Sequence, residues 1–559
     1  MSSDRHATER QVLLDLQKAG AGRRFFGYVK LSGPGWLQSA LTLGGGSLSS
    51  SLYLGVLAGS SLLWIQPFAM VLGVIMLSAI GYVTLSTSER PFGALNRHVS
   101  PVLGWSWALA SLAANMVWAL PQYSLASGVL QQNLMPGLLG PDGPLGDTGA
   151  KVLIVSVILV TTTLVTWSYG RSGPGIRLFE RTLKIVVAII VLCFIGVVVR
   201  LATADGLDWG RIARGFIPSF GSLFEPSDEF SPLLGAVDAG YRDFWRTVIV
   251  EKQRDVMMAA VATAVGINMT FLFPYSLLRR GWGKEYRGLT VFDLSTGMLI
   301  PFVLATSCVV IASASRFHAE PPAGLVDGGA DVAASQQKDY QGLLERRLAS
   351  EWEPPVGTTR EDVDRRLEEL PRADRVLAAT LVKRDAFDLA QSLEPLTGRL
   401  FANVIFGLGV LAMTVSTISL LMLISGLVLC EILGKPPEGT LFKVGTLFAA
   451  TGALGPFLWS KAAFWLAIPT SIFGLTLLPI AYLSFLFLMN RPALLGPEML
   501  RGGKRIASNT VLVFAAGLAT VASIWMIWIN GNIYGIAAVA TLLMGALTLQ
   551  FIRASSDDL

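Results

Sequence analysis

The sequence predicts an all-α integral membrane protein with about twelve transmembrane helices. The chain has 559 residues, of which 52% are hydrophobic and only 15% charged, whereas an average soluble domain is about 25% charged. The apolar residues form long runs without charge, and about 20 such residues cross the hydrocarbon core as a helix. Together these observations exclude a soluble globular protein.

The predicted spans follow one another along the whole chain. They cover residues 33–58, 61–87, 101–134, 152–168, 180–200, 256–280, 293–315, 400–430, 442–459, 463–489, 509–529 and 533–551. Residues 1–32 lack the apolar core of a signal peptide, so we expect them to form a cytoplasmic amphipathic arm.

The distribution of basic residues predicts the orientation. Lys and Arg lie in the N-terminal arm and in alternate connections, whereas loops 135–150 and 530–532 contain neither. By the positive-inside rule both termini are cytoplasmic, and we expect the chain in a bacterial inner (plasma) membrane. The net charge of +5 follows from this topology. The expected partners are membrane lipid and a small solute or cation, with no nucleic acid; no oligomeric state is predicted.

Two long polar segments separate groups of spans. Residues 201–255 are expected to form an extracytoplasmic connection of short helices, and residues 316–398 an extracytoplasmic helical insert that caps the outer mouth. Within the insert, Thr359 followed by Asp362 fits a helix N-cap, and Pro371 is a plausible break.

Two spans carry signs of interruption. The stretch "LTLGGGSLSSSLYLG" at 41–55 places three glycines inside span 1, and each glycine costs a helix roughly 1 kcal/mol relative to Ala. In span 6, "NMTFLFPY" contains Pro274, which removes a backbone donor. Interruptions at corresponding positions of two repeats indicate a transporter's binding site, because irregular backbone at that depth must line a cavity or be buried in protein.

Several stretches resemble the Nramp family of divalent-metal transporters. These are "GPGWLQSALTLGGGS" in span 1, "GSSLLWIQPFAMVLGVIMLSAIGYVTLST" in span 2, "RLFERTLKIVV" entering span 5, "GFIPSF" before span 6 and "TGRLFANVIFGLGVLAMTVSTISLL" in span 8. The resemblance implies metal ion transport by a secondary transporter with a LeuT-type fold of the APC superfamily. That fold consists of two inverted five-helix repeats, with discontinuous helices 1 and 6, here followed by two C-terminal helices.

The resemblance divides the chain into five parts. They are the N-terminal arm (1–32), the first repeat with helices 1–5 (33–200), the extracytoplasmic connection (201–255), the second repeat with helices 6–10 and the insert (256–490), and helices 11–12 with a cytoplasmic tail (491–559).

The family's metal ligands do not carry over to this chain. The motif DPGN falls on Gly44, Gly45, Gly46 and Ser47, and the Met-Pro-His motif of the sixth span falls on Phe273, Pro274 and Tyr275. The carbonyl that precedes this Met in the family falls near Thr270. No Asp, Glu, His, Lys or Arg lies in the interior of a span, whereas manganese and iron sites favour oxygen and nitrogen ligands that include an anion. A standard transition-metal site and a carboxylate proton relay are therefore not expected, and Met269 is assigned to packing.

Three hypotheses follow. The first is transport of a weakly ligated or hydrated cation such as magnesium, bound by backbone carbonyls and neutral oxygens. The second is transport of a small neutral or zwitterionic solute such as an amino acid, held by unwound backbone. The third is a degenerate, non-transporting scaffold. The candidate substrate-binding residues are Thr42, Gly44, Gly45, Gly46, Ser47, Asn268, Thr270, Phe273 and Tyr275, with Pro274 as the helix break.

No enzyme or cofactor site is predicted. The serines at 47 and 49–51 have no His or acidic partner for nucleophilic catalysis, and the cysteines Cys193, Cys308 and Cys430 lie in separate spans with no metal-binding spacing.

Overall fold

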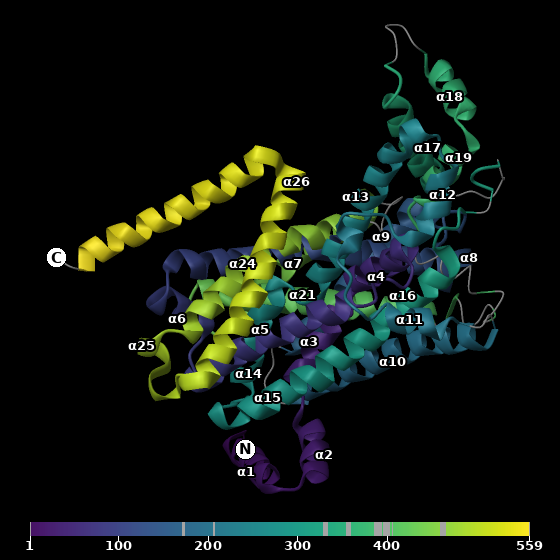
Figure 1. Ribbon diagram of the computed structural model, residues 1–559. Coiled ribbons are helices and arrows are strands. Elements are labelled where there is room, and N and C mark those ends of the chain that lie inside the picture. The colour runs from purple at the N-terminus through teal and green to yellow at the C-terminus, as the bar shows by residue number, and fades with distance from the viewer. Residues whose placement is uncertain are drawn as a thin grey trace.

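The computed structural model describes residues 2–169, 174–204, 207–322, 324–327, 334–353, 359–384, 394, 398, 403–404, 406–458 and 466–557. Within these residues the protein is built from helices and contains no strand (Figure 1). The predicted all-α class is therefore confirmed.

Ten helices in the described residues are long and apolar enough to cross a membrane, and one bent pair of shorter helices makes up to eleven. The bent pair is α3 (Pro34–Thr42) and α4 (Gly45–Ala58). The other spans contain α5 (Ile65–Thr87), α7 (Pro101–Val129), α9 (Gly146–Tyr169), α10 (Pro174–Ala204), α13 (Arg242–Ala264) with α14 (Ile267–Arg279), α15 (Arg287–Leu294) with α16 (Ile300–Phe317), α21 (Phe406–Ile432), α22 (Gly439–Thr446) with α23 (Gly455–Leu458), α24 (Ala467–Met489) and α26 (Gly502–Asp557).

These helices coincide with eleven of the twelve predicted spans. The twelfth, 533–551, falls in the part of α26 whose side chains lie outside the described residues. Short helices connect the spans: α6 (Pro91–His98), α8 (Pro136–Leu139), α11 (Trp209–Arg214), α12 (Ser231–Ala236) and α25 (Pro492–Leu495).

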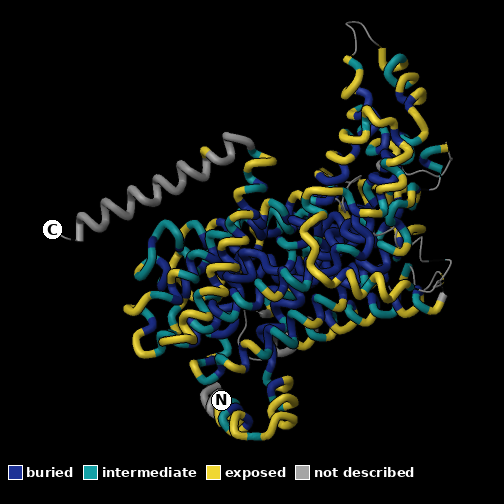
Figure 2. The backbone as a smooth tube through the Cα atoms, in the orientation of Figure 1, coloured by how far each residue is buried: buried dark blue, intermediate teal, exposed yellow. Residues whose placement is uncertain are grey.

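The spans divide into an inner and an outer group (Figure 2). In the most apolar windows of Ala239–Arg279 and Phe406–Ile432, 89% of residues are buried inside the protein, against 33% for Gly146–Ser168 and Lys184–Thr203. A helix that is apolar on all sides can be buried in a bundle or face lipid. The broken helix α13/α14 therefore lies among protein neighbours, and so does α3/α4, most of whose residues are buried.

Small residues allow the inner helices to approach closely. A Cβ on Gly55 of α4 would lie 2.6 Å from the Val310 carbonyl oxygen of α16, and a Cβ on Gly452 would lie 2.4 Å from Ala119 of α7. Close approach of this kind holds α4 next to α16 and fixes the inner face of the bundle.

The predicted break at Pro274 is wrong. Helix α14 continues through Pro274, and the interruption lies earlier in the chain, at Val265 and Gly266. Val265 has an extended backbone (φ −141°, ψ 114°), as has Gly266 (φ −88°, ψ 161°), which is the N-cap of α14. Proline removes one donor from a membrane helix, and neighbouring groups can compensate for that loss.

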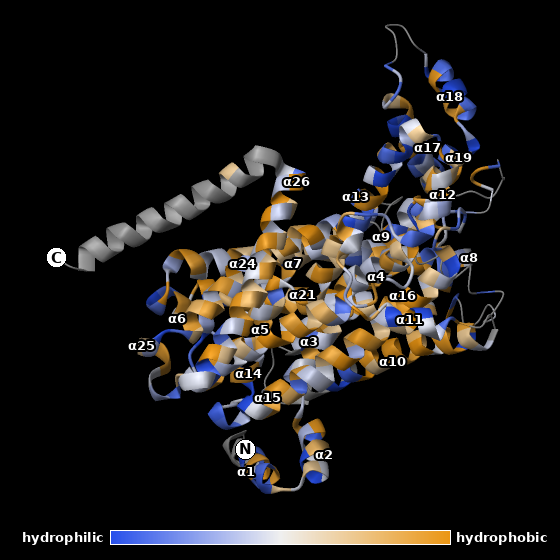
Figure 3. Ribbon diagram, viewed as in Figure 1, coloured by the Kyte–Doolittle hydropathy of each residue, from blue (hydrophilic) through white to orange (hydrophobic). Residues whose placement is uncertain are grey.

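The insert forms a hydrophilic projection at one end of the molecule (Figure 3). It contains α17 (Ala334–Ala349), α18 (Arg360–Glu369) and α19 (Arg372–Thr380), and the predicted N-cap at Thr359 and break at Pro371 are confirmed. The buried side chain of Asp374 accepts hydrogen bonds from Trp245 Nε1 of α13 at 2.6 Å and from Arg347 Nε at 2.8 Å. These bonds connect the insert to the N-terminal part of α13.

The N-terminal arm lies at the opposite end of the molecule and consists of α1 (Ser2–Lys18) and α2 (Ala21–Leu31) (Figure 1). Gln17 Nε2 donates to the Glu285 carbonyl oxygen at 3.0 Å, and Arg10 pairs with the Glu285 carboxylate. The start of α3 is fixed by Asp293, whose Oδ2 accepts from the N–H groups of Gly33 at 3.2 Å and Gly35 at 2.7 Å.

Candidate functional site

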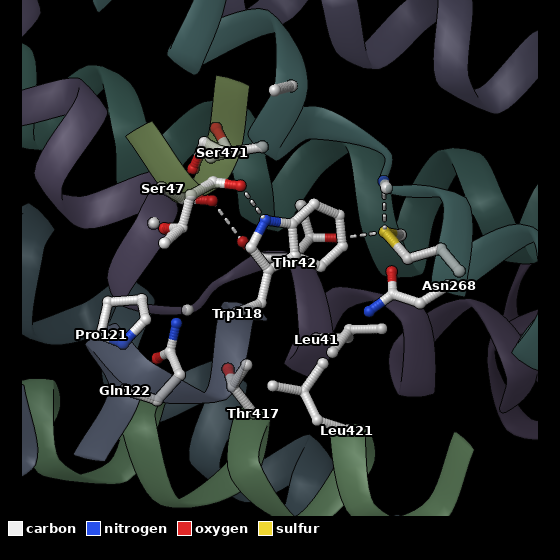
Figure 4. A pocket seen from close by; sticks show the side chains of 17 residues that line it. Leu41, Thr42, Ser47, Trp118, Pro121, Gln122, Asn268, Thr417, Leu421 and Ser471 are labelled. Carbon is white, nitrogen blue, oxygen red and sulfur yellow. Dashed lines mark hydrogen bonds between the residues drawn. The ribbon is translucent and has the colours of Figure 1, made fainter. Parts of the chain in front are cut away.

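A cavity lies where the two broken helices meet (Figure 4). Its volume is about 50 Å³. The lining residues come from α3/α4, α7, α13/α14, α21 and α24: Leu41, Thr42, Gly44, Gly46, Ser47, Trp118, Pro121, Gln122, Ala262, Thr263, Gly266, Asn268, Met269, Thr417, Leu421, Thr470 and Ser471. None of these side chains carries a charge.

At the first break the glycine provides space. Leu43 (φ −78°, ψ 67°) and Gly44 (φ −117°, ψ −178°) separate α3 from α4, and the two helices are bent by 55°. Any residue can adopt the backbone angles of Gly44, but a Cβ at this position would lie 2.6 Å from Thr417 Oγ1. Gly44 therefore lets α21 approach the unwound backbone.

The backbone of this break is held by two side chains. Gln122 Oε1 of α7 accepts a hydrogen bond from the Gly45 N–H at 2.9 Å, which satisfies one of the free donors at the start of α4. On the other side, the Ser47 hydroxyl donates to the Thr42 carbonyl oxygen, spanning the gap between α4 and α3.

Trp118 fixes the second break. Its indole lies between Gly266, where a Cβ would be 2.2 Å away, and Gly474 of α24, where a Cβ would be 2.0 Å away. The indole Nε1 donates to the Thr470 carbonyl oxygen at 2.8 Å. Both glycines are thus needed to accommodate one large side chain on the cavity wall.

Met269 connects the two breaks. Its Sδ atom lies 3.4 Å from Thr42 Oγ1 at the end of α3 and 3.4 Å from the Gly266 N–H that precedes α14. The Gly266 N–H donates to the sulfur, whereas the single hydrogen of the Thr42 hydroxyl has a closer acceptor in the Gln38 carbonyl oxygen at 2.9 Å. The thioether therefore lines the cavity, although the sequence assigned Met269 to packing, and its position links the ends of two helices.

A chain of amides orients the side chain of Asn268 in the cavity wall. Asn268 Nδ2 donates to Asn115 Oδ1 at 3.0 Å, and Asn115 Nδ2 donates to Ser425 Oγ at 3.2 Å. These bonds orient the Asn268 amide so that its Oδ1 is the remaining acceptor. Asn268 is 1% exposed, and within the described part of the chain its Oδ1 has no hydrogen-bond partner.

The electrostatics of the cavity come from the backbone. Helices α3 and α13 end there, and free carbonyl groups give a helix C-terminus a partial negative charge. The N–H groups of Gly45 and Gly266, at the starts of α4 and α14, already donate to Gln122 and Met269. The unpartnered oxygen of Asn268 adds one further acceptor to the wall of the cavity. No group of three or more His, Cys, Asp or Glu that could hold a metal ion occurs among the described residues.

The structure brings five of the predicted binding residues to the cavity: Thr42, Gly44, Gly46, Ser47 and Asn268. Gly45 lies beside them, bonded to Gln122. The other three lie elsewhere. Thr270 Oγ1 accepts from Trp107 Nε1 at 2.9 Å, Phe273 packs against Gly81 of α5, and Tyr275 stacks on Phe271 at 4.8 Å. These three were placed at the site because the break was predicted at Pro274.

Several lining residues were not predicted from the sequence, among them Trp118, Gln122, Thr263, Thr417, Thr470 and Ser471. The sequence does point to Gln122 and Asn115, because both are amides within the apolar helix α7. The hydroxyl residues gave none, since Ser and Thr are common in membrane helices and most bond to the carbonyl of the preceding turn.

Comparison with known proteins identifies the family and the fold of the chain. The profile of the natural resistance-associated macrophage protein-like (Nramp) family matches residues 35–342 and 374–528. No curated protein matches the sequence. Two solved structures of the Eremococcus coleocola manganese transporter, its H236A mutant and a complex with an aromatic bis-isothiourea compound, share 14% identity with TM-scores of 0.61 and 0.62. Each covers 95% of both chains.

MhsT in complex with L-phenylalanine matches with 12% identity and a TM-score of 0.50, covering 88% of this chain and 98% of MhsT. MhsT has the LeuT fold. The predicted LeuT-type fold is therefore confirmed.

Proposed function

This chain belongs to the Nramp family, and from that premise we propose that it is a secondary transporter of a divalent cation that is bound weakly and keeps part of its hydration shell, with magnesium as the preferred ion. The observation that carries the proposal is the chemistry of the cavity, whose lining contains no charged side chain and includes Asn268, the amide with an unpartnered oxygen.

The size of the cavity supports a partly hydrated ion. A volume of about 50 Å³ is several times the roughly 10–15 Å³ that one water molecule needs. The space therefore accommodates an ion with a few of its waters. Mg²⁺ dehydrates reluctantly and is usually held by few protein ligands together with several waters.

The donor set disfavours a dehydrated transition metal. Removing the hydration shell of a divalent ion is very costly without a compensating charge, and none lines the cavity. The Met269 sulfur, which suits softer metals, already accepts from the Gly266 N–H and contacts the Thr42 hydroxyl. A metal ion that binds to the sulfur would have to replace its contacts with Thr42 and Gly266.

An amino acid fits the cavity less well. Its carboxylate would bind free N–H groups at the start of a helix, but the Gly45 N–H is already bonded to Gln122. To reach the Gly45 N–H, a carboxylate would have to displace the Gln122 amide, whereas a cation would leave this bond intact.

Uptake into proteoliposomes tests the proposal. We expect the purified protein to carry Mg²⁺, with Mn²⁺ competing weakly. Asn268→Ala removes the free oxygen and should lower Mg²⁺ uptake at limiting concentration at least several-fold. Thr270→Val is the matched control, since Thr270 lies two residues away and outside the cavity, and it should leave the uptake of Mg²⁺ little changed.

Three results would overturn the proposal. They are Mn²⁺ uptake that exceeds Mg²⁺ uptake, uptake of a neutral amino acid without uptake of either ion, and no flux of any of these solutes. The second result would favour an amino-acid carrier, and the third a non-transporting scaffold.

A further inference from the structure

Helix α2 has an exposed face that combines apolar and basic side chains. Phe25, Phe26 and Val29 are 48%, 67% and 41% exposed. Arg23 and Lys30 are also exposed, and the spacing of residues 23, 26 and 30 places these two cations on the same side of the helix as Phe26. Arg24 is exposed as well but lies on another side of the helix.

The charge on this face is uncompensated. Helix α2 contains no acidic residue, and no ion pair of Arg23 or Lys30 is found among the described residues. Helix α1 differs, because its Arg10 pairs with Glu285. The α2 face therefore presents two free cations beside three exposed apolar side chains.

The face continues the lipid-facing surface of the neighbouring span. The ring of Phe25 contacts Phe292 of α15 edge to face at 5.4 Å between centroids, and Tyr28 contacts the same ring at 5.3 Å. Beside Phe292, Val291 is 46% exposed, and Ile300 and Leu304 of the same span are 50% and 42% exposed. Apolar surface thus extends from the span onto α2, which ends just before the spanning helix α3 begins.

We propose that α2 is an interfacial helix that binds anionic lipid. Phe25, Phe26 and Val29 enter the boundary between headgroups and acyl chains, and Arg23 and Lys30 pair with lipid phosphates. Amphipathic helices with aromatic and basic residues bind anionic membrane surfaces in this way. Lipid binding at α2 is independent of the ion or solute that enters the cavity.

The depth of α2 in the bilayer tests this binding. A spin label is placed at Phe26→Cys in full-length protein whose Cys193, Cys308 and Cys430 are replaced by Ala, and the protein is embedded in nanodiscs of phosphatidylcholine with or without one quarter phosphatidylglycerol. With the anionic lipid, we expect the label to be accessible to oxygen and shielded from a water-soluble nickel chelate. A label at Asp15→Cys on α1 is the control and should stay accessible to the chelate.

Retention of phosphatidylglycerol by native mass spectrometry measures the charge contribution. Each of Arg23→Gln and Lys30→Gln should lower retention about fivefold, whereas Arg24→Gln should lower it less. Equal chelate access at residue 26 in both nanodiscs would overturn the proposal. The proposal would also be overturned if the label at residue 26 were buried equally in nanodiscs without phosphatidylglycerol. Equal losses of retained phosphatidylglycerol in Arg23→Gln, Lys30→Gln and Arg24→Gln would overturn it as well.

Discussion

The two helix breaks that form the cavity are built in different ways. Helices α3 and α4 are bent by 55° at Leu43 and Gly44, whereas α13 and α14 follow one another within one candidate span of 41 residues, Ala239–Arg279. The first break is held by polar groups, through Gln122 and Ser47. The second is held by packing, because the Trp118 indole fills the space beside Gly266.

In neither break does a glycine serve a left-handed backbone conformation. Gly44 and Gly266 both have negative φ, and what each supplies is space for a neighbouring helix. The difference lies in the neighbour. At Gly44 it is the Thr417 hydroxyl, and at Gly266 it is a large ring clamped against a second glycine, Gly474. The second break should therefore tolerate substitution less well.

The largest effect is expected from Gly266→Ala. The new methyl group would lie 2.2 Å from the Trp118 ring, so the indole must move and its bond to Thr470 weakens. Overpacking of this kind costs about 1–3 kcal/mol. The thermal unfolding midpoint in detergent should fall clearly, and by more than in the matched variant Gly44→Ala. A larger fall for Gly44→Ala would reverse the comparison.

Gln122→Leu should have the next largest effect. It leaves the buried Gly45 N–H without its acceptor, at a cost of about 1–3 kcal/mol. The same change frees a donor at the start of α4, so we expect weaker binding of Mg²⁺ and stronger binding of anions or carboxylates. Titration calorimetry measures both. Unchanged Mg²⁺ affinity would show that the hydrogen bond from Gly45 does not set the preference of the cavity.

Asn268→Asp adds a negative charge at the second break. A carboxylate at this position supplies the anion that transition metals favour, so Mn²⁺ affinity should rise about tenfold, equivalent to about 1.4 kcal/mol. Asn115→Asp, one hydrogen bond further from the cavity, is the control and should raise it less. If the variant and the parent protein bind Mn²⁺ with equal affinity, the ion does not bind next to residue 268.

Met269→Leu should have a small effect. It removes two contacts of 3.4 Å to the sulfur while keeping a side chain of similar volume, which usually costs less than about 1.5 kcal/mol. A modest fall in the unfolding midpoint with unchanged Mg²⁺ uptake is expected. Loss of all ion uptake would instead identify the sulfur as an ion ligand.

Pro274→Ala should have the smallest effect. Helix α14 runs through this position, and the alanine regains an N–H that can bond within the helix. We expect an unchanged or raised unfolding midpoint and unchanged uptake. A strong loss of uptake would mean that the functional break lies at Pro274 after all.

The sequence predicted the spans well because length and apolarity decide which segments cross a membrane. It also predicted the first break, where three glycines stand together. It misplaced the second, because a proline is a strong local signal while Val265 and Gly266 carry almost none. The Trp118 ring that packs against Gly266 is distant in sequence. Gln122 and Thr417 contribute to the cavity through similar long-range contacts.

The most direct test of the account is a structure of the protein determined with Mg²⁺ and again with Mn²⁺. We predict density for Mg²⁺ and its waters in the cavity, next to Asn268 Oδ1 and the carbonyl groups at the end of α3, with the Gly45–Gln122 bond retained. Density for a dehydrated Mn²⁺ against the Met269 sulfur, with the Mg²⁺ sample empty at this place, would contradict it.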